Sequence, residues 1–97
     1  MQIKLVIEGK EKSFTTPFIK GRMLRRALEI NKKMDLNNLD EEGLDTLIRF
    51  VCEVFNNEFS VDDFYDGIEI SEMIPTIKNV IEEVVGKANG DSNPKNL

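Results

Sequence analysis

The apolar positions at the start of the chain alternate with polar ones, and this pattern predicts a β-strand. Ile3, Leu5 and Ile7 follow the period of two that is typical of a half-buried strand. The following strand is expected to end at Pro17, because proline has no N–H to donate to a sheet. An isolated hairpin is barely stable in water, so its apolar face must pack against the rest of the chain.

The two strands are expected to be joined by a two-residue turn at Gly9-Lys10, giving a hairpin over residues 2–16. Glycine at the first central position of such a turn suits the type II′ conformation. This turn predicts a register in which Leu5 lies opposite Phe14, and Ile3 opposite Thr16.

Beyond the hairpin the apolar residues recur at helical spacing. This periodicity predicts helices near residues 18–33, 40–55, 61–66 and 71–85. Asn38 or Asp40 is expected to cap the second helix, and Gly86 to end the last one. Pro75 is compatible only with the beginning of that last helix, because proline breaks the interior of a helix.

The segment EFSVDDFYDG contains the strongest local signal in the chain. Ser60 and Asp63 have the spacing of a capping box, and Phe59 and Phe64 have the spacing of a hydrophobic staple. A helix of one to two turns is therefore predicted here, and Gly67 is expected to close it.

These elements predict an α+β fold, with an N-terminal β-hairpin packed on a bundle of three to four helices. Residues 1–86 are expected to form a single globular domain, and residues 87–97 a disordered tail without periodicity. The predicted core includes Leu5, Phe14, Leu24, Leu28, Leu47, Ile48, Val51, Phe55, Ile77 and Ile81.

The composition is that of an ordinary globular domain, with 40% hydrophobic and 32% charged residues among 97. No apolar run approaches the ~18 residues of a membrane span, and no membrane association is expected. The N-terminus lacks the apolar core of a signal peptide, so a cytoplasmic location is expected.

Few residues could support catalysis or metal binding. The chain has no histidine that could activate its single cysteine, Cys52, which lies on an apolar helix face and is expected to be buried. A calcium loop aligned on Gly67 would place Phe64 and Met73 at ligand positions, so that match fails. No glycine stands in a phosphate-binding pattern. We therefore predict no catalytic residue, metal or cofactor, and a protein that is not an enzyme.

The formal charge of −5 conceals a strong asymmetry. Residues 1–34 have nine basic and three acidic side chains, whereas residues 35–83 have fourteen acidic and two basic ones. The first predicted helix concentrates the basic groups, which are Lys20, Arg22, Arg25, Arg26, Lys32 and Lys33. This basic face could bind nucleic acid, an anionic membrane or an acidic protein, or it could be only a solvated helix surface. The acidic half would repel phosphates, so nucleic acid is not the expected partner.

Three segments, FTTPFIKGRMLRRALEI, LDEEGLDTLIRFVCEVFNNEF and SVDDFYDGI, resemble tail assembly chaperones of long-tailed, siphovirus-type phages and prophages of Gram-positive bacteria. The resemblance spans roughly residues 2–86 and rests on the order of these segments, not on a catalytic signature. It implies a small, mainly helical, non-enzymatic protein of the host cytoplasm that is absent from the finished virion. It also implies that many members have a longer, frameshifted form, which would extend from the C-terminal tail.

The resemblance further implies two partners, the tape-measure protein and the tail-tube subunit, with self-association also possible. It supplies no binding residues, so the basic face and the pair Phe64-Tyr65 are our own candidates for contact with a partner. Two other interpretations stay open: a small prophage regulatory or nucleic-acid-binding protein, and a structural head–tail component.

Overall fold

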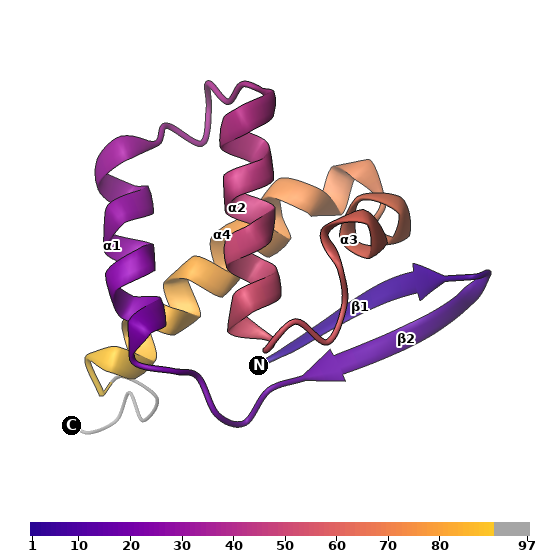
Figure 1. Ribbon diagram of the computed structural model, residues 1–97, viewed down its shortest axis with the longest axis horizontal. Helices are drawn as coiled ribbons and strands as arrows, with labels where there is room; N and C mark the ends of the chain where they lie inside the picture. Colours follow the sequence, from indigo (N-terminus) through magenta and orange to yellow (C-terminus); the bar gives the residue numbers. More distant parts are fainter. Residues whose placement is uncertain (91–97) are drawn as a thin grey trace.

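The computed structural model describes residues 1–90, which form an antiparallel hairpin followed by four helices (Figure 1). The elements are, in chain order, β1 (Gln2–Ile7), β2 (Lys10–Thr15), α1 (Arg22–Lys33), α2 (Glu41–Val54), α3 (Val61–Gly67) and α4 (Ile70–Ala88). Helix α4 packs against both α1 and α2, and α3 packs against β1 (Figure 1). The predicted α+β architecture is confirmed.

The hairpin turns one residue earlier than predicted. Glu8 and Gly9 occupy the turn with φ angles of 54° and 78°, the two positive values of a type I′ turn. Ile3 consequently lies opposite Phe14, and Leu5 opposite Lys12, so the predicted register was wrong by two residues. A slip of two preserves the faces of a strand, and Ile3 and Leu5 are still buried.

Helix α1 begins at Arg22, four residues later than the predicted start at Phe18. The Thr16 hydroxyl donates a hydrogen bond of 2.9 Å to the Phe18 carbonyl, which holds the chain in a bend after β2. Gly21 occupies the N-cap position and provides no side-chain cap. The late start leaves the Phe18 side chain 71% exposed.

The caps of α2 and α3 agree with the sequence. Asp40 accepts a hydrogen bond of 2.8 Å from the Gly43 N–H at the start of α2. Ser60 and Asp63 form both bonds of the capping box. The ring of Phe59 stacks on that of Phe64 with centroids 6.3 Å apart, which confirms the staple.

Helix α4 is longer than predicted at its C-terminal end. It passes through Gly86 to Ala88, and Gly90 then adopts the left-handed conformation with φ of 78°. The glycine that follows the helix is therefore Gly90, and the predicted stop at Gly86 was wrong. Residues 87 and 88, predicted as tail, are helical, and residues 91–97 of that tail lie outside the described residues. Pro75 lies inside the helix at an exposed position. Proline has no N–H to donate to the carbonyl four residues earlier, and water can bind that carbonyl at an exposed position.

The core lies where the inner face of the hairpin meets the helices. It includes a cluster of phenylalanine rings, in which Phe59 is in contact with Phe14, Phe55 and Phe64. Seven predicted core residues are buried: Leu5, Leu47, Ile48, Val51, Phe55, Ile77 and Ile81. Phe14 and Leu24 are half-buried, whereas Leu28 is 53% exposed, so its assignment to the core was wrong. Within residues 1–90, none of the helices is both long and apolar enough for a membrane span.

Candidate functional site

Helix α1 has apolar residues on two sides, and only one of these two sides is buried. Met23, Ala27 and Ile30 pack into the core against α2 and α4. Leu24 and Leu28 lie one turn apart, and at 100° per residue Leu28 is on the side opposite Ile30. Leu28 therefore presents an apolar side chain to solvent in the middle of the helix.

The exposed side of α1 forms a shallow hollow of about 480 Å³, which we call the α1 groove. It is lined by Gly21, Leu24, Arg25, Leu28, Glu29 and Lys32. The spacing of these residues by three and four follows one side of the helix. Arg25 lies 3.8 Å from Glu29 in an exposed pair, which is too weak to withdraw the guanidinium from another partner. The groove thus combines an apolar centre with available positive charge.

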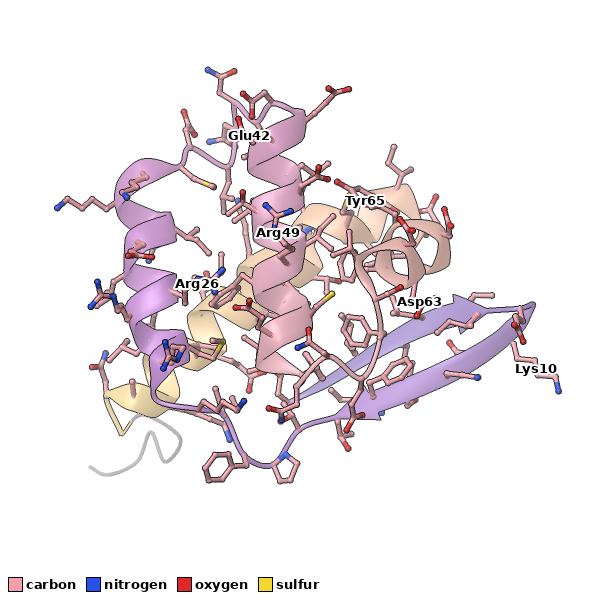
Figure 2. The ribbon with its side chains drawn as sticks, viewed as in Figure 1. Lys10, Arg26, Glu42, Arg49, Asp63 and Tyr65 are labelled. Atoms are coloured by element: carbon pink, nitrogen blue, oxygen red, sulfur yellow. The ribbon has the colours of Figure 1, made fainter. Side chains whose placement is uncertain are left out.

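The six basic residues predicted to form one docking face are divided by the structure. Arg26 forms an ion pair with Glu53 of α2, between the two helices (Figure 2). Lys33 lines a different hollow, at the C-terminal end of α1. Lys20 and Arg22 are exposed but lie outside the α1 groove. Of the predicted set, only Arg25 and Lys32 lie beside the exposed leucine.

The aromatic pair predicted to contact a partner is part of the fold. Phe64 is 0% exposed, so the structure contradicts its assignment to a binding surface. The hydroxyl of Tyr65 donates a hydrogen bond to the Asp45 carboxylate of α2 (Figure 2). Partial burial and this bond raise the pKa of Tyr65 to about 12. Tyr65 therefore ties α3 to α2.

Comparison with known protein families shows a match. The model of a family described as "phage tail chaperone protein" matches residues 1–97, the whole chain. The chain belongs to the phage tail chaperone family. No curated protein and no solved structure matches it significantly.

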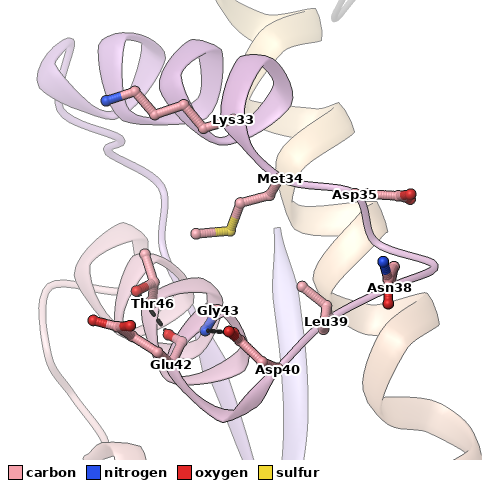
Figure 3. Close-up of a pocket in the computed structure, with 9 residues that line it drawn as sticks. All are labelled: Lys33, Met34, Asp35, Asn38, Leu39, Asp40, Glu42, Gly43 and Thr46. Carbon is pink, nitrogen blue, oxygen red and sulfur yellow. Dashed lines mark hydrogen bonds between the residues drawn. The ribbon is translucent and has the colours of Figure 1, made fainter.

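A second hollow in this tail chaperone, of about 590 Å³, lies between the end of α1 and the start of α2 (Figure 3). Some of its polar groups are engaged in local bonds: the Asp40 carboxylate caps α2, and the Thr46 hydroxyl donates to the Glu42 backbone carbonyl. The Asp35 carboxylate accepts the Asn37 N–H. Among residues 1–90, no cluster of three His, Cys, Asp or Glu side chains could hold a metal ion. The local hydrogen bonds of Asp35, Asp40 and Thr46 therefore shape the connection between α1 and α2.

Cys52 is buried on α2, as its position in the apolar pattern predicted. Burial, with smaller contributions from the Asp63 and Glu53 carboxylates, raises the pKa of the thiol from 9.0 to about 11. A nucleophilic cysteine needs a lowered pKa, so this environment favours an inert, protonated side chain.

The feature that sequence reasoning missed in the tail chaperone is the exposed position of Leu28. The sequence predicts Leu28 in the core because it falls at helical spacing with the other apolar residues of this helix. The angular distance of Leu28 from Ile30 indicates that the two side chains cannot both face the core, since two residues correspond to about 200° around a helix. A helix with apolar residues on both sides can bury only one side against a small core.

Proposed function

We propose that this tail chaperone binds an amphipathic helix of the tape-measure protein in the α1 groove during tail assembly. The observation that carries the proposal is Leu28, exposed beside Arg25 and Lys32. Helix-in-groove recognition uses apolar anchors at intervals of three and four residues, with flanking charges that set the orientation. An acidic, amphipathic helix complements this surface in both respects.

The role proposed here is binding without catalysis, in the host cytoplasm, with release before the virion is complete. The tail-tube subunit is the second proposed partner. Family membership supports this role, because a chaperone shields a partner surface that is later buried in the assembly. A long helical protein exposes apolar residues until the tail tube surrounds it, and the groove would cover some of them.

The charges of the α1 groove would act mainly on the rate of association. Attraction between exposed charges decays over the Debye length, which falls from about 10 Å at 0.1 M salt to about 3 Å at 1 M. We therefore expect capture of the tape-measure protein to slow as salt rises, whereas the contact at Leu28 persists.

The test is co-expression of the tagged chaperone with the tape-measure protein of the same phage. Arg25→Glu/Lys32→Glu and, separately, Leu28→Ser should each abolish co-purification. Both leave the Arg26–Glu53 pair intact, whereas a substitution of Arg26 would confuse binding with folding.

The matched control is Lys10→Glu/Lys12→Glu on strand β2, which makes the same change of charge at exposed positions away from α1. It should co-purify at the wild-type level. If folded groove variants retain the tape-measure protein as well as this control does, the α1 groove is only a solvated surface.

A further inference from the structure

Strand β1 has an edge that faces away from β2. The Thr16 N–H donates to the Met1 carbonyl, which makes Met1 and Thr16 a hydrogen-bonded pair. In an antiparallel ladder hydrogen-bonded and non-hydrogen-bonded pairs alternate, so Ile3 and Leu5 exchange hydrogen bonds with β2. The backbone groups of Gln2, Lys4 and Val6 therefore point away from β2. Within residues 1–90, no backbone bond outside the hairpin ladder involves these three residues. The outer edge of β1 thus offers unpaired donors and acceptors.

The C-terminal end of α3 covers one part of this edge. A Cβ atom built on Gly67 would lie 2.7 Å from the Val6 carbonyl oxygen and 3.2 Å from the Val6 nitrogen. Only glycine allows α3 to approach β1 so closely. The edge is therefore closed at Val6 and open from Gln2 to Lys4.

A groove of about 430 Å³ lies along the open part of the edge, between β1 and α4. Ile68 and Val80 contribute apolar surface to it. Two ammonium groups line it, those of Lys4 and of the Met1 N-terminus. Four carboxylates outnumber them: those of Glu11, Glu69, Glu72 and Glu83. The groove is therefore negative, in contrast to the positive α1 groove.

We propose that this groove, the β1 groove, accepts an extended segment of a partner protein in which basic and apolar residues alternate. The segment would add to β1 as a short third strand. Its backbone would bond to Gln2 and Lys4, and its basic side chains would lie among the four carboxylates. In strand addition the main chain supplies affinity and the alternate side chains supply specificity.

Lys4 accounts for the selectivity of the β1 groove. A lysine on an edge strand discourages pairing with arbitrary strands. The surrounding carboxylates attract a basic segment and so offset its repulsion by Lys4. They repel an acidic segment and so make its binding less favourable. An edge that only needed protection from aggregation would not require this excess of opposite charge around the lysine.

The first experiment uses the whole chain and a synthetic peptide of about six residues, the length of an ordinary strand, with alternating lysine and valine. Saturating peptide should slow amide hydrogen exchange at Lys4 about tenfold or more, because that N–H becomes hydrogen-bonded. Glu11 and Ser13 provide an internal control, since their backbone groups point to the outer edge of β2. Equal protection of both edges, or of neither, would overturn the proposal.

The second experiment changes the charge of the groove. Glu72→Lys/Glu83→Lys alters two exposed residues and should weaken peptide binding about tenfold or more. Glu58→Lys/Glu82→Lys makes the same change of net charge at exposed positions outside the groove, and should bind within about twofold of wild type. An equal loss of peptide affinity in both variants would show that only the net charge of the protein matters, and it would refute the site.

Two further outcomes would also count against the proposal. A peptide with glutamate in place of lysine should not slow amide hydrogen exchange at Lys4. If it did, the carboxylates of the groove would have no role in the choice of partner. Protection of Lys4 that rises with chaperone concentration in the absence of peptide would identify a second copy of the chain as the occupant. None of these measurements involves the α1 groove, so their outcome is independent of the tape-measure experiment.

Discussion

Residues 59–67 and residues 18–33 both contain strong sequence signals, but only the first segment folds as those signals predict. The capping box and the staple at α3 form as expected. In the second segment the helix starts four residues late and one of its leucines lies outside the core. The difference shows that a cap whose donor and acceptor lie within one helical turn forms as its spacing predicts, whereas the choice of a buried face depends on distant residues.

The largest expected effect comes from Phe59, which connects the start of α3 to the rest of the core. Phe59→Ala removes a ring that contacts Phe14, Phe55 and Phe64, and should lower the free energy of unfolding by about 3–5 kcal/mol. Urea denaturation followed by circular dichroism measures this loss. Leu28→Ala, the control on α1, should change stability by about 0.5 kcal/mol or less. Similar losses in the two variants would mean that Leu28 belongs to the core after all.

An intermediate effect is expected at alkaline pH from Cys52, whose thiol lies near Asp63 at the start of α3. The pKa in the folded chain, about 11, is above the ordinary 9.0, so folding favours the protonated thiol. The resulting stability is present below pH 9 and is lost as the pH rises toward 11, by about 2–3 kcal/mol. Urea denaturation across this range should show a steeper fall for wild type than for Cys52→Ala. Parallel curves would show that the thiol is not desolvated.

The smallest effect tests the cap itself. Ser60→Ala removes the bond from the Asp63 N–H and should cost about 1 kcal/mol. Ser60→Asp should restore most of the loss, because aspartate is an equally good N-cap. Thermal midpoints of the three proteins provide the measurement. An unchanged midpoint for Ser60→Ala would show that the core alone holds α3 in place.

The sequence by itself determined the order of the elements, the cap of α3, the inward face of β1 and the burial of Cys52, and it restricted the cap of α2 to Asn38 or Asp40. Each depends on residues within one turn or on a simple period. The turn of the hairpin was missed because glycine can serve at either central position, and Glu8-Gly9 and Gly9-Lys10 both contain it. The end of α4 was missed for a similar reason, since a helix can pass through Gly86 when a second glycine follows.

Only the tertiary structure decided which basic and aromatic residues are available for binding. Arg26 and Tyr65 are polar-tipped side chains on helix surfaces, and they are engaged because Glu53 and Asp45 of α2 lie within reach. Phe64 is buried because α3 packs on the hairpin. The open edge of β1 likewise depends on how far Gly67 covers it. Local chemistry sets what a side chain can bond to, but the packing of distant segments sets which partners it meets.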